Sequence, residues 1–298
     1  MNGARVNTRR MSGFTLTEIA IVMVILGLVV VAAIPVTSGI FAAQRKNDTL
    51  NKLAGVETAM VNFVAQNRRL PCPADGALAS GNVNAGVEAR NIGTGDCTPV
   101  NSGVVPWVTL GLPEIAAQDG WTNRLTYRVT TGATGLTRAL SLDLSACDPA
   151  GTGDFTNSVA ASPATVCLQR PPCAANAALS CTSPTNYLKG AGRGLQIQNA
   201  AGTILMDPGT GTGAAYVVIS AGDNTAGAYS ASGALLAGTA PVGTQEATNR
   251  NGQALQAFYF DTVQIYSTTP GTNYFDDLVL RPSIMAVAAK AQLGPRGF

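Results

Sequence analysis

The sequence contains no histidine among its 298 residues. Without histidine, a Ser-His-Asp site, a Cys-His site and an H-E-x-x-H zinc site are all excluded. A G-x-x-x-x-G-K-[ST] phosphate-binding motif is also missing, so any hydrolysis of ATP would belong to a partner. These absences predict that the chain is not an enzyme.

Charged residues are scarce, at 12% of the chain, and the formal net charge is only +2. Three of the 19 basic residues, Arg5, Arg9 and Arg10, precede residue 13, where no acidic residue offsets them. The rest of the chain has 16 basic and 17 acidic residues, so it lacks the basic character that attracts nucleic acid. We therefore expect no nucleic-acid partner.

None of the six cysteines belongs to a C-x-x-C pair, which argues against a zinc site. An even number of cysteines in an exported chain favours disulfides, and six cysteines allow 15 pairings. Proximity in the sequence favours Cys72–Cys97 and Cys173–Cys181. Residues 145–190 hold four cysteines and few large apolar residues, which predicts a disulfide-rich insertion. The disulfide candidates are Cys72, Cys97, Cys147, Cys167, Cys173 and Cys181.

The N-terminal segment "MSGFTLTEIAIVMVILGLVVVAAIPV" combines a basic start with a long apolar run at residues 19–36. A run of this length predicts a membrane-spanning helix, and the arginines predict a cytoplasmic N-terminus. A cleaved secretory signal would have a shorter apolar region, and a plain signal anchor would not account for Glu18. The third interpretation is a cut between Gly13 and Phe14, before the apolar run.

Cleavage at this position would give Glu18 a partner. A carboxylate inside a membrane costs about 2.5–3.5 kcal/mol and usually pairs with another group. The new ammonium of Phe14 lies four residues before Glu18, one helical turn away, and could pair with it within one chain or between neighbours. The pattern therefore indicates that many such helices assemble side by side.

The stretch "GFTLTEIAIVMVILGLV" resembles the class III signal of type IV pilins and of type II secretion pseudopilins. The resemblance implies that a prepilin peptidase cuts after Gly13 and methylates Phe14. It also implies that Glu18 acts in assembly and that Gly27 and Pro35 weaken the helix. In this interpretation residues 1–13 are the leader, 14–43 the transmembrane and assembly helix, and 44–70 its amphipathic continuation.

The remaining sequence predicts an α+β fold, with the long helix packed on an antiparallel β-sheet in a globular part at residues 71–298. The amphipathic stripe that should dock on the sheet consists of Leu50, Leu53, Val56, Met60, Phe63 and Val64. Strand-like segments are expected at residues 119–130, 138–144, 195–199, 203–206, 214–222, 258–267 and 274–283, followed by a short helix at 284–292.

No cofactor is expected, although calcium stays open because major pseudopilins often bind it in a C-terminal loop. Oxygen ligands could come from Asp148, Asp154 and Asp223, none of which has EF-hand spacing. Asp276 and Asp277 would point to opposite faces of a strand and could not share one ion.

The resemblance implies a minor pilin or pseudopilin, since a bulky globular part suits a tip or adaptor position. Its partners would be other pilins or pseudopilins, the prepilin peptidase, the inner-membrane assembly platform and the lipid bilayer. The chain would cross the inner membrane once, with its C-terminal part in the periplasm, and would then enter a pilus or pseudopilus. The alternative is a filament-borne adhesin or a receptor for a surface, polysaccharide or DNA.

Overall fold

A computed structural model describes residues 15–91, 96–98, 103–132, 135–144, 188, 192–239, 243–252, 255–266 and 274–294, with the side chains of residues 30–39 excepted. Residues 1–44 and residues 45–298 form two separate compact units. The helices are α1 (Leu16–Asn67), α3 (Thr244–Asn249) and α4 (Ile284–Lys290), with 3-10 turns η1 (Glu114–Ala117) and η2 (Pro208–Thr210). The strands are β1 (Ala74–Asp75), β2 (Gly103–Val104), β3 (Thr126–Val129), β4 (Gln196–Gln198), β5 (Ile204–Met206), β6 (Tyr216–Ser220), β7 (Phe258–Phe260) and β8 (Leu278–Leu280).

The part of α1 that belongs to the second unit packs through an apolar stripe, as predicted. Leu53, Val56, Met60 and Val64 are buried, and Thr49 extends the stripe by one turn. Leu50 was wrongly assigned to this stripe, because it is one position off the buried face and 45% exposed. The helix ends at Asn67, where the next residue, Arg68, adopts a left-handed backbone conformation with φ of 56°.

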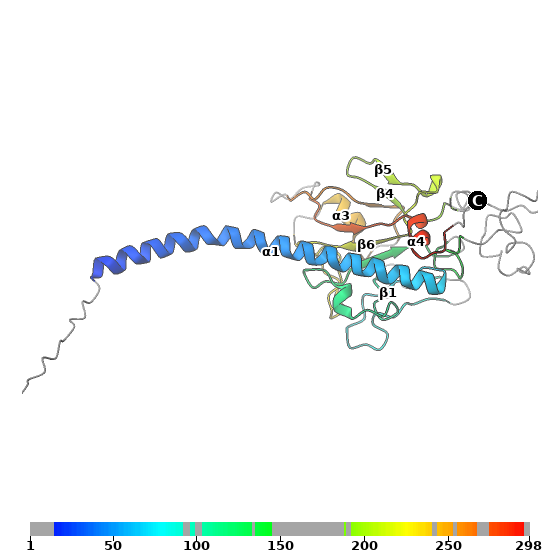
Figure 1. The fold of residues 1–298 in the computed structure, drawn as a ribbon, viewed down its shortest axis with the longest axis horizontal. Coiled ribbons are helices and arrows are strands. Elements are labelled where there is room, and N and C mark those ends of the chain that lie inside the picture. The colour runs from blue at the N-terminus through cyan, green and yellow to red at the C-terminus, as the bar shows by residue number, and fades with distance from the viewer. Residues whose placement is uncertain are drawn as a thin grey trace, which may run out of the picture. The chain divides into compact units, whose positions relative to one another are not determined.

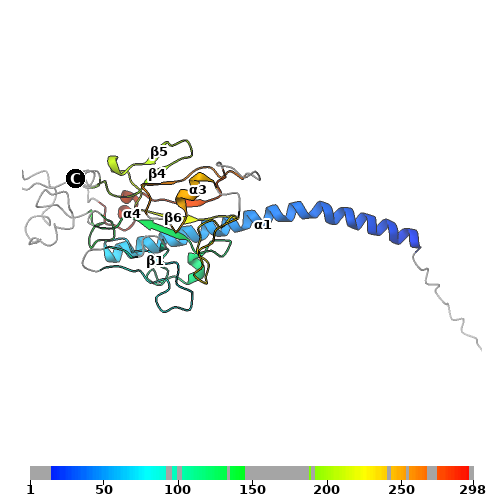
Figure 2. The same ribbon diagram turned by 180° about the vertical axis from the view of Figure 1, so that it is seen from behind.

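The larger sheet has five antiparallel strands in the order β1-β2-β3-β6-β8. Strand β6 lies at the centre of the fold, with α1 on one side and β4 and β5 on the other (Figure 1). Its Tyr216 and Val218 join the core beneath α1, whereas Val217 and Ile219 join the core beneath the second sheet. This alternation along one strand produces three layers, a helix and two sheets, and Figure 2 shows the same layers from behind.

The second sheet has three strands in the order β5-β4-β7, and its β4 and β7 are parallel. A parallel pair was not expected from the sequence. The free edge of β7 is closed by a side chain of α3. Asn249 donates from Nδ2 to the Phe260 carbonyl at 3.0 Å and accepts at Oδ1 from the Phe260 N–H at 2.9 Å. The amide thus replaces a neighbouring strand at this residue.

The α+β class is therefore confirmed. Two other expectations, a membrane-spanning helix and a disulfide-rich globular part, are not. Among the residues whose placement is described, no helix is both long and apolar enough to span a bilayer. The predicted span at residues 14–43 includes Phe14 and the side chains of residues 30–39, which lie outside the described part. The backbone of α1 continues through Gly27 and Pro35 as one helix.

The description of the globular part as disulfide-rich was an overstatement. Cys72 and Cys97 form a disulfide, as their proximity predicted, and this bond is the only one within the described residues. The other four candidates, Cys147, Cys167, Cys173 and Cys181, lie outside these residues, as does the predicted insertion at 145–190 apart from Leu188.

Residues 138–144 were expected to form a strand, but they form consecutive turns. Leu142 and Leu144 are buried because the turns bring this segment back to the end of α1. The Leu142 N–H donates to the Arg68 carbonyl at 3.0 Å, and the Leu70 N–H donates to the Leu136 carbonyl at 2.8 Å. The same polar–apolar alternation therefore serves a folded loop instead of a strand.

Candidate functional sites

The first described residues of α1 form a reciprocal capping box. The Thr15 N–H donates to Oε2 of Glu18 at 2.8 Å, and the Thr15 hydroxyl donates to the same oxygen at 2.9 Å. In return, the Glu18 N–H donates to Oγ1 of Thr15 at 3.3 Å. Because α1 begins at Leu16, Thr15 is its N-cap and Glu18 its third residue, the positions that this motif requires. The sequence pattern T-x-x-E is the signature of this capping box, a local signal separate from the proposed pairing of Glu18 with Phe14.

Beyond Glu18, the first unit exposes a continuous apolar surface. Every large apolar side chain from Ile19 to Val29 is more than half exposed; these residues are Ile19, Ile21, Val22, Met23, Val24, Ile25, Leu26, Leu28 and Val29. Gly27 lies within this segment, and a Cβ at its position would have no atom within 4 Å beyond the nearby helix backbone and chain neighbours. The processing residues Gly13 and Phe14 lie outside the described residues. A helix with apolar side chains on all sides requires an apolar environment or apolar partners.

A second candidate site is a buried cluster of three carboxylates in the globular unit, Glu246, Asp276 and Asp277. One oxygen from each residue lies within 4.8 Å of the oxygens of the other two. Glu246 belongs to α3, and the two aspartates directly precede β8. All three side chains are buried.

This arrangement corrects the expectation that Asp276 and Asp277 face opposite ways. The expectation assumed a strand, but β8 begins only at Leu278, so the period of two does not apply to these aspartates. Both carboxylates can therefore turn toward Glu246, which no local sequence pattern connects to them.

The outer oxygens of the cluster are held by a shell of donors. Oδ2 of Asp276 accepts from the N–H groups of Asp223 and Asn224 at 2.7 and 2.9 Å, and from the Tyr274 hydroxyl at 3.0 Å. Oδ2 of Asp277 accepts from Asn249 at 2.8 Å. In contrast, Oδ1 of Asp276 has no hydrogen-bond partner, although the residue is only 1% exposed.

The electrostatics of the cluster disfavour three negative charges. Burial, together with contact between the Glu246 and Asp276 carboxyl groups, raises the pKa of Glu246 to about 8. Burial and the nearby charge of Glu246 raise the pKa of Asp277 well above its usual range. Among the described residues, no basic side chain forms an ion pair with any of the three carboxylates.

The three calcium candidates from the sequence have different outcomes. Asp148 and Asp154 lie outside the described residues. Asp223 adjoins the cluster through its backbone N–H, but its Oδ1 accepts from Nε1 of Trp121 at 2.8 Å. The structure therefore brings Asp223 near the cluster without adding its carboxylate to the three.

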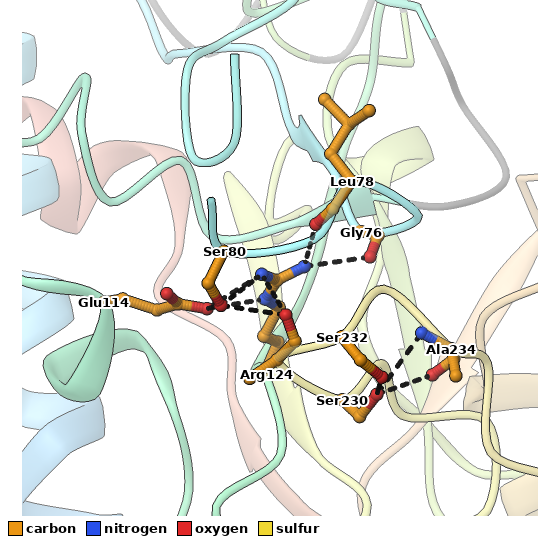
Figure 3. Close-up of polar contacts among 9 residues, drawn as sticks. Gly76, Leu78, Ser80, Glu114, Arg124, Ser230, Ser232 and Ala234 are labelled. Carbon is orange, nitrogen blue, oxygen red and sulfur yellow. Dashed lines mark hydrogen bonds and ion pairs between the residues drawn. The ribbon is translucent and has the colours of Figure 1, made fainter. Parts of the chain in front are cut away.

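A buried arginine organises the loops on another part of the same unit (Figure 3). Nε and Nη2 of Arg124 donate to Oε1 of Glu114 at 2.9 and 2.8 Å. Nη1 donates to the carbonyls of Gly76 and Leu78 at 3.0 and 2.6 Å. The guanidinium also lies over the Trp107 ring, 4.9 Å from its centroid. Because its donors are used by protein groups, Arg124 is a structural clamp and does not offer a ligand site.

Comparison with known proteins gives a match at the N-terminus. Residues 8–34 match the family described as the prokaryotic N-terminal methylation motif. The chain therefore carries the class III signal that is typical of type IV pilins and pseudopilins, as the resemblance of the sequence indicated. No curated protein and no solved structure matches the chain.

Proposed function

We propose that this chain is a minor pilin or pseudopilin subunit, cleaved after Gly13 and assembled through its N-terminal helix into a type IV pilus or type II secretion pseudopilus. The observation that carries this proposal is the methylation motif at residues 8–34. This motif contains the cleavage position, Phe14 and Glu18 in their required order.

The exposed apolar side chains of α1 support assembly through this segment. Nine large apolar residues between Ile19 and Val29 contact little of the chain itself. Before assembly, the inner membrane and its assembly platform would cover this segment, and afterwards the helices of other subunits would do so. The leader would stay cytoplasmic and the globular unit would lie in the periplasm, where an oxidising environment suits the Cys72–Cys97 disulfide.

A structural role is favoured over a catalytic one. The sequence has no histidine for the common acid–base and nucleophilic sites. The globular unit, residues 45–298, is large for a repeating shaft subunit, which favours a minor position such as a tip or adaptor.

Processing can be tested directly with the full-length chain in a bacterium that expresses a prepilin peptidase. Wild-type protein should lose residues 1–13 and carry a methyl group on the Phe14 nitrogen, as measured by mass spectrometry of the intact chain. Gly13→Val should abolish cleavage, because the added side chain lies at the bond to be cut. The matched control Gly3→Val changes a leader glycine away from that bond and should be processed normally. Mature Gly13→Val protein at the wild-type level would contradict the proposal.

A further inference from the structure

We propose that one surface of the globular unit docks on the lipid bilayer, where it contacts phospholipid headgroups and the adjoining ends of the acyl chains. This inference rests on the proposed function, because it requires α1 to anchor the chain in the inner membrane. It adds a second membrane contact, outside the anchoring segment. The docking surface consists of Arg45, Lys46, Trp121, Val263, Ile265 and Tyr266.

The apolar part of the docking surface is the loop that follows β7. Val263 is 80% exposed, Tyr266 64% and Ile265 40%. The loop is nevertheless held by the fold, since Ile265 and Phe275 exchange two backbone hydrogen bonds of 2.7 and 3.0 Å. The Tyr266 ring also packs edge-on against Tyr274, with the ring centroids 6.3 Å apart. The fold therefore presents these apolar side chains outward in a defined arrangement.

This loop is attached to α1 next to residue 45, where the globular unit begins. Nζ of Lys46 donates to Oε1 of Gln264. Nε2 of Gln264 donates in turn to the Asp276 carbonyl at 2.9 Å. Because Gln264 lies between Val263 and Ile265 in the sequence, both exposed apolar side chains directly adjoin an anchor on α1.

Trp121 reaches the same turn of α1 from another loop. The N–H of the preceding residue, Gly120, donates to Oγ1 of Thr49 at 2.8 Å. A Cβ at Gly120 would lie 2.2 Å from the Arg45 carbonyl oxygen, so only glycine allows this close approach. Trp121 itself is half-buried, and its Nε1 donates to Oδ1 of Asp223 at 2.8 Å. The aromatic ring therefore lies near the start of the globular unit, as the apolar loop does.

The place of this surface along α1 matches the thickness of a bilayer. The 26 residues between Glu18 and Arg45 carry no charge. A helix of this length spans about 40 Å at 1.5 Å per residue, and a bilayer with its headgroup regions is about 40–45 Å thick. With Glu18 at one interface, Arg45 therefore reaches the headgroups at the other.

The residue types of the docking surface suit that interface. Tryptophan and tyrosine concentrate there, because their rings combine an apolar body with a polar tip. Arg45 is exposed, and neither Arg45 nor Lys46 forms an ion pair with another described residue. Both cations are therefore able to meet lipid phosphates, while the apolar tips of the loop enter the acyl boundary.

Nearby acidic side chains oppose this attraction only weakly. Asp48 pairs with Lys52, and Asp261 pairs with Arg281. The exposed Asp223 has the hydrogen bond from Trp121 described above. The contact also need not be strong, because anchoring through α1 makes docking an intramolecular step.

Trp121 supplies a direct probe of docking, since the other tryptophan, Trp107, is only 4% exposed. The full-length chain is reconstituted into vesicles of phosphatidylethanolamine and phosphatidylglycerol. One set of vesicles carries bromine atoms near the headgroup end of the acyl chains, and bromine quenches tryptophan fluorescence on contact. The brominated vesicles should therefore lower the emission of the wild-type chain, and Trp121→Phe should abolish this loss.

Two variants separate the apolar and the charged contributions. Val263→Asp should lower the ratio of docked to undocked chains about tenfold or more, because the acyl boundary rejects a carboxylate. Arg45→Gln should lower it about fivefold in these anionic vesicles and have little effect in vesicles of phosphatidylcholine. The matched control is Val83→Asp, at a valine that is 88% exposed outside the docking surface, and it should leave the quenching unchanged. Equal Tm values would show that all three variants fold.

Three results would overturn docking on the bilayer. The first is equal wild-type emission in brominated and ordinary vesicles, for chains that float with the vesicles. The second is quenching that Val263→Asp leaves unchanged. The third is loss of emission that depends on protein density and not on bromine, which would assign the surface to a second copy of the chain. Chains that do not float with the vesicles would instead refute the membrane anchoring of the proposed function, so the two failures are distinguishable.

Discussion

Glu18 and Thr15 bind each other reciprocally at the start of α1, with the Glu18 carboxylate 2.8 Å from the Thr15 nitrogen. The carboxylate is therefore satisfied within its own chain by the end of the helix that it belongs to. A role in capping and a role in pairing with the Phe14 ammonium are distinct, because an uncharged acceptor can fulfil the first but not the second.

Replacing Glu18 separates these two roles. Glutamine at this position retains the capping acceptor but has no charge, whereas valine removes both. If pairing with the ammonium sets the register of neighbouring subunits, Glu18→Gln and Glu18→Val should each reduce incorporation into filaments about tenfold or more. Immunoblots of sheared filaments, normalised to membrane-bound protein, would measure this. Wild-type incorporation of Glu18→Gln would show that the cap alone is needed.

Loss of the Arg124 clamp should strongly destabilise the globular unit. Arg124→Met would leave Glu114 and several carbonyl groups without their donor, at a cost of about 3–5 kcal/mol in the free energy of unfolding. Arg281→Met is the matched control, because its ion pair with Asp261 is partly exposed and contributes about 0–1 kcal/mol. Urea unfolding monitored by tryptophan fluorescence would compare them. Equal costs would mean that Arg124 is not a clamp.

Two buried tyrosines provide a second matched pair. The Tyr127 hydroxyl donates to the Pro71 carbonyl at 3.0 Å, whereas the Tyr216 hydroxyl has no partner. At neutral pH, Tyr127→Phe should therefore cost about 1 kcal/mol in the free energy of unfolding. Tyr216→Phe should cost nothing or slightly stabilise the fold, since an unsatisfied polar atom is removed. A larger loss for Tyr216→Phe in urea unfolding would contradict this assignment.

The same tyrosines predict lower stability at alkaline pH. Burial raises the pKa of Tyr127 and of Tyr216 above the usual value of 10. Above pH 10 the unfolded chain loses these protons while the folded chain retains them, so stability is complete below pH 10 and falls as pH rises. Each tyrosine contributes a slope of up to about 1.4 kcal/mol per pH unit. Tyr216→Phe should reduce this slope in urea unfolding at pH 10–11; an unchanged slope would refute the prediction.

The Cys72–Cys97 disulfide should contribute substantially to stability. Its cysteines are 25 residues apart, and a loop of this size corresponds to about 3–4 kcal/mol in the chain-entropy description. The double variant Cys72→Ser, Cys97→Ser should lose this amount in urea unfolding, without any reductant that could affect the other cysteines. A loss below about 1 kcal/mol would mean that the loop is already ordered in the unfolded chain.

The long helix α1 and the short helix α4 were predictable because their signals are local, whereas α3 was not predicted. The spacing of Leu53, Val56 and Met60 defined the buried face of α1. The prediction of a strand at residues 138–144 was wrong because the structure of this segment depends on contacts that are distant in the sequence. Its alternation is the same in a strand and in a loop anchored by Arg68 and Leu70, and only long-range contacts distinguish the two.

The two candidate sites differ in the same way. The methylation motif is continuous in the sequence, so the segment that contains Gly13 and Glu18 could be recognised by its resemblance to class III signals. The carboxylate cluster joins Glu246 to Asp276 and Asp277 through tertiary folding, and no spacing rule connects them. The prediction also failed because it treated the aspartates as strand residues, although β8 begins just after them.

The side chain of Asn249 has a further consequence for the exposed edge of the second sheet. An open strand edge recruits strands from other molecules and leads to aggregation. At Phe260, both backbone groups on the edge of β7 are already bonded to the Asn249 amide. A strand from another copy would have to displace this amide, which also holds Asp277. Asn249 thereby blocks this edge, at Phe260, against pairing with a strand of another molecule.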